Sequence, residues 1–504
     1  MTSPTSAAQG PQDLSRRVQK LQSILDVAKQ MAAERDLDNL LPLIASHAAR
    51  VISADRCSIF ILDRERNELW SKVAQGAKSE IRLPVGSGIS GTVAQTGMVI
   101  NIEDAYQDER FNRSFDDANG YRTRTILAVP MRDAGGEVAG VIQALNKSEG
   151  TFNAEDEELL LALGGQAASA IENAQLHQEI NKLFKGFVDA SVVAIESRDP
   201  TTSGHSTRVA KLTVALARAT EHLRTGPYAG TRFNADQLRE IDYASLLHDF
   251  GKVGVREPVL VKADKLYPHE LDALRARFQL ARKDRELQSL RRRLEVARQK
   301  GPAALADLER EEEPALLASL KELDDVMEFI LACNRPTVLA QGGFERLSSV
   351  SKIGFQDAYG KPLPLLTEGE VKVLSIPRGS LSQEERVEIE SHVTHTYRFL
   401  SQIPWTRDLR RVPEIAWAHH EKLNGKGYPR AIPAPEIPVQ SKMMAISDIY
   451  DALTASDRPY KKAVPHEKAL DILKTESDQG QIDGDLFKVF VEADVPRKTL
   501  QAVK

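Results

Sequence analysis

The alternation of apolar and polar positions changes character about a tenth of the way along the chain. From about Leu14 to Ile52 the apolar residues recur at the spacing of an amphipathic helix. Short apolar runs follow, separated by turn signals such as Gly86-Ser87-Gly88 and Gly135-Gly136. They predict strands at residues 58–62, 68–73, 98–102, 125–130 and 138–146. Because helical segments interrupt these strands, the pattern predicts an α+β domain with a mostly antiparallel sheet.

A continuous helical pattern extends from about Ala154 to Arg198, a stretch without proline. Its apolar positions alternate at spacings of four and three residues: Leu176, Ile180, Leu183, Phe187, Ala190 and Ala194. This spacing is typical of a coiled-coil seam, about three heptads long. We therefore predict a connecting helix at 176–198 that pairs with a second copy in a parallel homodimer. A packing stripe on a single helix is the alternative.

The remaining chain is helical wherever its periodicity is clear. Two charged helical stretches, Leu271–Lys300 and a second ending near Ala332, flank Gly301-Pro302. They predict a helical hairpin inside an insertion at 266–375, serving as a solvated element, a dimer contact or a substrate lid. Residues 335–375 show no clear pattern. The polar ends predict a disordered tail at 1–13 and a closing helix with a tail at 475–504.

Composition narrows the function classes. A length of 504 residues predicts two or three domains, and a net charge of -5 gives no basic footprint for nucleic acid. Two cysteines, Cys57 and Cys333, exclude a disulfide framework and favour a reducing compartment. No apolar run approaches the ~20 residues of a membrane span, and the N-terminus lacks a signal pattern. We expect a cytoplasmic protein that binds neither nucleic acid nor membrane.

Histidines and carboxylates gather in five separated places of the helical part. These are His205; His248-Asp249, with Lys252 one turn later; His392, on a helix opened by a capping box of Ser382 and Glu385; His419-His420; and Asp448 with Asp451 on one helical face. The pair His419-His420 is predicted at the end of a helix that begins near Pro413 and stops at Gly425. Imidazole and carboxylate without thiol suit iron, manganese or zinc, and two such ions can clamp a phosphate.

The other histidines have no such setting. His47, His177, His222, His269 and His466 are expected at the surface, and His395 is expected to pack or to support a ligand.

These motifs resemble, in order, those of the HD-GYP phosphodiesterases, a helical subclass of the HD metal-dependent phosphohydrolases. The match covers a domain at 187–474 apart from the insertion, and it includes Gly425-Lys426-Gly427-Tyr428-Pro429 and Asp457-Arg458-Pro459-Tyr460-Lys461. The resemblance implies hydrolysis of cyclic di-GMP to pGpG and GMP by a hydroxide held between two divalent metal ions, Fe or Mn. Another substrate, such as cyclic GMP-AMP, and an inactive cyclic-dinucleotide receptor are the alternatives.

Site roles follow from the same resemblance. The implied metal ligands are His205, His248, Asp249, His392, His419, His420 and Asp448, with Asp249 bridging. Lys252 would assist the leaving oxygen beside Asp249, and Arg458 and Lys461 would bind substrate. Asn424 replaces the usual Asp, at a position we expect to be structural. Thr201 stands where three-metal members carry a carboxylate, so two metal ions are predicted.

The N-terminal domain, predicted at 14–175, resembles a GAF domain. The resemblance rests on Gly88–Ala94, Ile102–Phe111, Gly120–Arg124, Asn146-Lys147 and Phe152–Glu157. The last two are similar to the signature of GAF domains that bind cyclic nucleotides. They imply a pocket for cyclic AMP or cyclic GMP, with the phosphate at Ile89 and Ser90 and other contacts from Tyr106, Thr123 and Gln143. A dimerising GAF domain with an empty pocket is the alternative.

The predicted architecture is therefore multidomain. An α+β GAF domain is joined by a long helix to an all-α HD-GYP domain that carries a helical-hairpin insertion.

Overall fold

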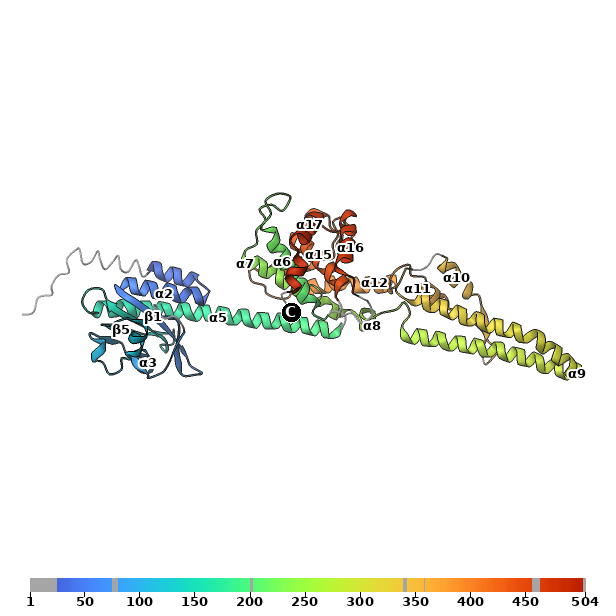
Figure 1. Cartoon of the computed structure of the whole chain (residues 1–504), viewed down its shortest axis with the longest axis horizontal. Helices are drawn as coiled ribbons and strands as arrows, with labels where there is room; N and C mark the ends of the chain where they lie inside the picture. Colours follow the sequence, from blue (N-terminus) through green and yellow to red (C-terminus); the bar gives the residue numbers. More distant parts are fainter. Residues whose placement is uncertain are drawn as a thin grey trace, which may run out of the picture. The chain divides into compact units, whose positions relative to one another are not determined.

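The computed structural model describes residues 25–74, 80–199, 203–338, 342–357, 359–455 and 463–501. The chain forms two compact units, Met1–Gly186 and Phe187–Lys504, and helix α5 (Ala154–Arg198) contains the boundary between them (Figure 1). The predicted tail at 1–13, Thr201, Arg458 and Lys461 lie outside the described residues.

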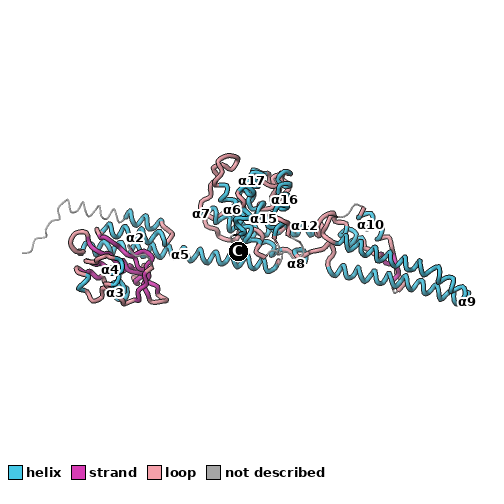
Figure 2. Tube along the Cα trace, viewed as in Figure 1, coloured by secondary structure: helices cyan, strands magenta, loops and turns pink. Residues whose placement is uncertain are grey.

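The N-terminal unit is built on the sheet drawn in magenta in Figure 2. This antiparallel sheet has six strands in the order β3-β2-β1-β6-β5-β4. The strands are β1 (Ala54–Asp63), β2 (Glu68–Ala74), β3 (Ile81–Pro84), β4 (Ile100–Ile102), β5 (Ile126–Arg132) and β6 (Val138–Lys147). The predicted α+β class is confirmed. The sequence did not indicate β3, because this short strand is defined only by its pairing with β2.

Side chains of β1 alternate between two apolar layers, as the two-residue period of a strand requires. On one face, Ile59 packs with residues of α2 (Leu37–Val51) and with the first part of α5. On the other, Phe60 packs with residues of α3 (Gly88–Thr96). Two short elements, η1 (Ala105–Gln107) and α4 (Ser114–Asn119), follow.

The predicted helix from Leu14 to Ile52 is interrupted. Residues 25–33 are helical, and α2 begins only at Leu37. Asp36 has an extended backbone that separates the two segments, and it caps α2 by accepting a hydrogen bond from Asp38 N at 2.8 Å.

A buried ion pair joins the sheet to α5. Lys147, at the end of β6, lies 2.7 Å from Asp156 in the first turns of α5 and also donates to Ile52 O at 2.7 Å. Beyond this region the predicted coiled-coil seam of α5 is exposed: Leu183 has 78% of its surface accessible, and Ile180 has 60%. Leu183 and Ile180 are therefore largely uncovered in the described part of one chain.

The C-terminal unit is all-helical apart from a small strand pair in the insertion, as predicted (Figure 2). Its first helices are α6 (His205–Thr220), α7 (Ala235–Leu247), η3 (Phe250–Gly254) and α8 (Glu257–Leu260). After the insertion come α12 (Gln383–Glu390), α13 (His392–Leu400), α14 (Val412–Trp417), η4 (Ala434–Glu436), α15 (Val439–Thr454), α16 (His466–Asp478), α17 (Gly484–Glu492) and α18 (Val495–Gln501). Residues of α6, α7, α15, α16 and α17 share one apolar core, which fixes the helix ends that carry the site.

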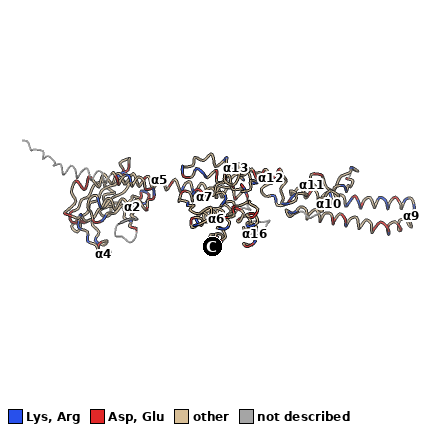
Figure 3. Tube along the Cα trace, turned by 90° about the horizontal axis from the view of Figure 1, so that it is seen from above, with Lys and Arg blue, Asp and Glu red and all other residues tan. Residues whose placement is uncertain are grey.

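The insertion contains the predicted helical hairpin, α9 (Pro268–Asn334), whose two arms meet at a kink where Gly301 has a φ of 82°. Lys and Arg alternate with Asp and Glu along both arms (Figure 3). The hairpin's ends are clasped: Lys265 N donates to Asn334 O at 2.9 Å, and Leu266 N donates to Asn334 Oδ1 at 2.7 Å.

The stretch 335–375 is more regular than its sequence indicated. It forms α10 (Gly343–Val350), the two-stranded pair β7 (Gly354–Gln356) and β8 (Pro362–Pro364), and α11 (Glu368–Leu374). Leu347, Phe355 and Leu374 pack against the base of α9, so tertiary contacts rather than periodicity determine this segment. None of the helices described is long and apolar enough to span a membrane.

Candidate functional site

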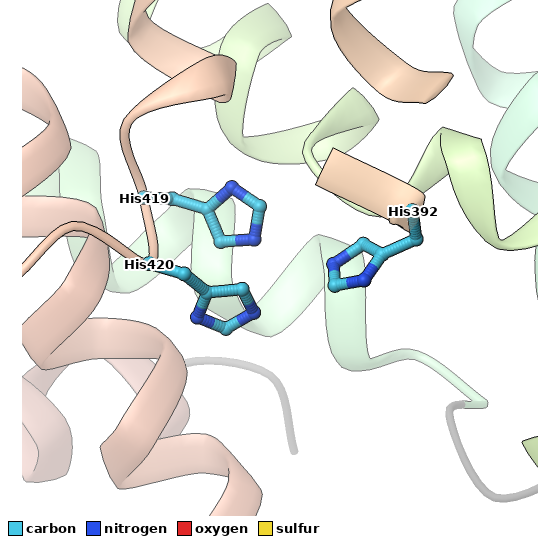
Figure 4. A group of neighbouring side chains, drawn as sticks. All are labelled: His392, His419 and His420. Atoms are coloured by element: carbon cyan, nitrogen blue, oxygen red, sulfur yellow. The ribbon is translucent and has the colours of Figure 1, made fainter. Parts of the chain in front are cut away.

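Five elements bring the predicted metal ligands together. His205 begins α6, His248-Asp249 follows α7, His392 begins α13, His419-His420 follows α14, and Asp448 lies on α15. Figure 4 shows His392, His419 and His420, whose ligating atoms lie within 4.8 Å of one another. Those of His205, His248 and Asp249 lie equally close to one another. Contacts of Asp249 join the two groups.

Asp249 is the carboxylate between the two histidine groups. Its Oδ1 lies 3.2 Å from His392 Nε2, and its Oδ2 lies 3.5 Å from His248 Nε2 and 3.9 Å from His205 Nε2. Asp448 has a similar place: its Oδ1 is 3.1 Å from His205 Nε2, and its Oδ2 is 4.0 Å from His420 Nδ1. Each carboxylate therefore presents its two oxygens to different imidazoles.

Three histidines are oriented by backbone carbonyls three residues earlier. The Nδ1 atoms of His248, His392 and His419 lie 2.7, 2.5 and 2.6 Å from the carbonyl oxygens of Ser245, Ile389 and Ala416. Because each Nδ1 donates its proton there, each Nε2 keeps a bare lone pair, and all three Nε2 atoms are buried without a hydrogen-bond partner. Buried polar atoms are rarely left in that state, so these orphaned acceptors fit cation binding.

The charges of the site also suit cations. Burial lowers the pKa of His248 and His419, and it lowers the pKa of His420 to about 3, so these imidazoles are neutral at neutral pH. Burial alone would raise the pKa of Asp249, but facing Lys252 and the histidines hold it well below its usual value. Burial likewise opposes ionisation of Asp448, and the hydrogen bond from His205 outweighs it, so the pKa of Asp448 is lowered.

His205 is held by a residue to which the sequence assigned no role. Asp451 Oδ2 lies 2.8 Å from His205 Nδ1, and Arg208 donates to Asp451 through Nε at 2.7 Å and Nη2 at 3.1 Å. Although burial lowers the pKa of His205, its bonds to Asp448 and Asp451 raise the pKa to about 9. The sequence showed that Asp448 and Asp451 share a helical face. It did not show that Asp448 contacts His205 Nε2 whereas Asp451 contacts His205 Nδ1.

Lys252 lies beside the bridging carboxylate. Its Nζ is 2.8 Å from Asp249 Oδ2 and 3.4 Å from Asp199 Oδ2. Burial lowers the pKa of Lys252, but the carboxylates of Asp249 and Asp199 outweigh burial, so the pKa is raised and the ammonium stays charged.

Two glycines allow the close packing of the site. A Cβ at Gly251 would lie 1.9 Å from His392 O, so only glycine lets α13 approach the His248-Asp249 turn. Thr396 fixes this contact, since its Oγ1 accepts from Gly251 N at 2.8 Å and donates to His248 O at 2.9 Å. A Cβ at Gly427 would lie 2.3 Å from Lys422 N, in the loop that brings the Tyr428 ring to 4.7 Å from His420.

Some local expectations differ from the structure. Helix α14 ends at Trp417, so His419-His420 lies in the following turn rather than on a helix that continues to Gly425. The local residue pattern predicts a continuous helix there and cannot show that the chain leaves it after Trp417. Asn424 accepts from Lys426 N at 3.1 Å in an exposed part of the loop.

Most of the remaining histidines lie where expected. His177, His222 and His269 are exposed, whereas His47 and His466 are half-buried. His466 Nδ1 lies 2.8 Å from the Tyr450 hydroxyl. His395 packs against Gly254.

The N-terminal unit contains a cavity of about 460 Å³ beside the sheet. Ile89 and Ser90 line it at the N-terminus of α3, and Thr123 and Gln143 line other walls. Backbone N–H groups at a helix N-terminus suit an anion. On one wall the Ser90 hydroxyl donates to Gln143 Oε1. Tyr106 does not itself line the cavity, but its hydroxyl donates at 3.1 Å to Oδ2 of Asp116, which does.

Comparisons with known proteins match both units. A GAF domain model matches residues 36–171, and an HD domain model matches residues 367–486. The HD match includes His392, His419-His420 and Asp448. His205 and His248-Asp249 lie before it, and only the fold joins them to the same site.

The curated relatives are much longer than the matched region. A Caenorhabditis elegans protein named "Probable 3',5'-cyclic phosphodiesterase pde-5" is 32% identical over 190 residues, which is 34% of this chain and 26% of the relative. The "Dual 3',5'-cyclic-AMP and -GMP phosphodiesterase 11A" of Takifugu rubripes is 37% identical over 174 residues, 32% of this chain and 19% of the relative. The chain thus spans about a quarter or less of the length of these two relatives.

Solved structures match the N-terminal region. The GAF domain of an Acinetobacter phosphoenolpyruvate-protein phosphotransferase is 22% identical, with a TM-score of 0.28, over 32% of this chain and 98% of that one. A free methionine-R-sulfoxide reductase from Neisseria meningitidis is 18% identical, with a TM-score of 0.29, over 35% of this chain and 99% of that one. On the two domain models, the chain combines an N-terminal GAF domain with a C-terminal HD domain.

Proposed function

We propose that the HD domain is a metal-dependent phosphodiesterase and that the GAF domain regulates it by binding a cyclic nucleotide. The observation that carries the proposal is Asp249, whose two oxygens face two groups of histidines with bare, buried Nε2 atoms. The neutral imidazoles of His248, His419 and His420 and the ionised carboxylates of Asp249 and Asp448 form a donor set typical of hydrolytic and redox-capable metal sites.

Two divalent cations, Fe or Mn, are the proposed cofactors. His392, His419 and His420 would hold one, His205, His248 and Asp448 the other, and Asp249 would contact both. When bound, such ions neutralise phosphate charge and lower the pKa of water. The protein's own part is to fix the imidazoles through Ser245, Ile389 and Ala416 and so to set the ligand positions before the substrate arrives.

Lys252 is the proposed group for the leaving oxygen. Its charged Nζ lies 2.8 Å from Asp249, so a phosphodiester bound by cations beside this carboxylate would lie within reach of the ammonium. There it donates a hydrogen bond or a proton as the 3′ oxygen departs. Asp199, 3.4 Å from Nζ, keeps the ammonium aimed at the site.

Cyclic di-GMP is the proposed substrate, on the basis of the ordered HD-GYP motifs and the Gly427-Tyr428-Pro429 loop beside His420. Cyclic GMP-AMP and binding without turnover are the earlier alternatives. A further candidate is hydrolysis of cyclic AMP or cyclic GMP, which the names of the matched relatives favour. Those relatives match only about a third of this chain, so the substrates are to be compared directly.

We expect the double substitution His248→Ala and Asp249→Ala to lower the turnover of cyclic di-GMP by about 1,000-fold or more, because it removes an imidazole and the carboxylate between the two groups. Metal content, measured by elemental analysis of anaerobically purified protein, should fall with it. The exposed His222→Ala serves as the control and should retain both.

A panel of cyclic di-GMP, cyclic GMP-AMP, cyclic AMP and cyclic GMP separates the substrate candidates. Retained turnover in the double variant would contradict the site assignment. Wild-type protein that is metal-loaded and binds cyclic di-GMP but forms no product would instead support a receptor.

For the support of His205, we expect Asp451→Asn to weaken metal binding by about 10- to 100-fold, because the amide no longer fixes the imidazole as a carboxylate does. Competition with a chelator measures the affinity. Asp471→Asn, at an exposed position of α16, is the matched control. Equal affinities in the two variants would show that Asp451 does not act through His205.

Cyclic AMP or cyclic GMP is the proposed ligand of the GAF cavity, with its phosphate at the N-terminus of α3. We expect Gln143→Leu to weaken binding by about tenfold or more, because it removes a polar group from the cavity wall. Calorimetry measures binding, and the phosphodiesterase rate is followed with and without ligand. Gln107→Leu, at an exposed position outside the cavity, is the control. No binding by the wild type, with an unchanged rate, would assign the GAF domain a structural role.

The exposed seam of α5 supports a proposed parallel homodimer. Leu183→Glu places a charge in the seam, and we expect it to weaken dimerisation by about 100-fold, measured by sedimentation velocity. Lys185 is exposed on the opposite side of α5. Lys185→Glu introduces the same side chain outside the seam and should change dimerisation little. If both variants dimerise as the wild type does, α5 does not form the contact.

A further inference from the structure

The first arm of α9 carries a second exposed apolar seam. We call it the leucine stripe; it consists of Leu280, Leu287, Leu290 and Leu294, which have 48, 42, 62 and 53% of their surface accessible. The spacings of seven, three and four residues place these side chains on one side of the helix. Ala273, Ala276 and Ala297 continue the same heptad positions at either end, and Lys283 occupies the position of this series between Leu280 and Leu287.

The leucine stripe faces away from the other arm of the hairpin. Arg282 contacts Asp324 of the second arm at 2.9 Å, Arg285 donates to Ser319 O, and Arg292 contacts Glu312 at 3.1 Å. At 100° per residue these arginines lie roughly opposite the leucines. The hairpin is therefore held together by its own charged pairs, and packing of the arms leaves the leucines uncovered.

Charged residues beside the leucine stripe change sign along the helix. Asp284 and Glu286 flank its first half, whereas Arg291, Arg293 and Arg298 flank its second half. Within one chain Asp284 accepts from Gln356 N at 3.1 Å, Glu286 lies 2.6 Å from Lys283, and Arg293 lies 4.0 Å from Glu309. These side chains would exchange partners on association. These are the positions that form interhelical ion pairs in coiled coils and determine helix orientation. The sign change makes the surface complementary to itself after a half-turn, which is the symmetry of a contact between two identical chains.

We propose that the leucine stripe is a contact between two copies of this chain, with their first arms antiparallel. With the dyad between residues 288 and 289, Leu287 packs beside Leu290 of the second copy. Asp284 then faces Arg291 of the second copy, and Glu286 faces its Arg293. In a parallel pair Glu286 would meet Arg291, but Arg293 would meet Arg298. In the antiparallel pair Arg298 faces Arg277, whose charge is already balanced by Glu370 of its own chain, so the charges favour the antiparallel arrangement.

This contact is distinct from the α5 seam and requires no activity of the metal site. To isolate it, association is measured by sedimentation velocity on the full chain in a Leu183→Glu background. Each of the substitutions Glu286→Arg and Arg293→Glu creates two pairs of like charges, because the twofold axis repeats the contact between residues 286 and 293. Each is expected to raise the dissociation constant by about tenfold, and the two together are expected to restore it to within about threefold of the parent.

A second pair of variants tests the apolar part. Leu287→Gln together with Leu290→Gln is expected to weaken association by about 100-fold, because two apolar contacts are lost from each chain. Leu317→Gln, on the second arm with 60% of its surface accessible, is the matched control and should associate like the parent. Circular dichroism verifies that α9 remains helical in every variant.

The proposal is overturned if the charge-swapped double variant associates no better than the single variants, or if the stripe variant and the Leu317→Gln control behave alike. A parent protein that remains monomeric in the Leu183→Glu background overturns it as well.

Discussion

The orientation of three buried imidazoles by backbone carbonyls is the constraint on which the site depends. The Nδ1 of His248, His392 and His419 is in each case bonded to the carbonyl three residues earlier. This bond fixes both the tautomer and the ring direction, so the Nε2 lone pairs converge without help from a ligand. Asp249 can face both histidine groups only because these rings are fixed.

Close approach of α13 to the turn after α7 makes this arrangement possible. Gly251 lets the two backbones meet, and Thr396 bonds to both Gly251 N and His248 O. The core shared by α6, α7 and α15 sets the other side, where Asp451 and Arg208 hold His205. The site is thus assembled from helix ends and one face of α15, whose positions are determined by the packing of the helices.

The sequence was informative where a motif is local and uninformative where a role depends on a distant partner. The adjacent pairs His248-Asp249 and His419-His420, and the ordered motifs around them, were enough to identify the residues that converge. They could not show that Asp451 holds His205, because Asp448 and Asp451 share a helical face and differ only in what that face meets. Strand β3 was missed for the same reason, because only its pairing with β2 defines it. The role of Tyr106 at the cavity stays a prediction, and its bond to Asp116 was likewise not evident from the sequence.

The hydrogen bonds that join the two ends of α9 determine how the insertion is attached to the HD domain. Asn334 bonds to both Lys265 and Leu266, so the chain leaves and returns to the α9 base at nearly one point. Adding or removing whole heptads from both arms together would leave that point unchanged. The length of the hairpin can therefore differ between variants of this chain while the geometry around Asp249 stays the same.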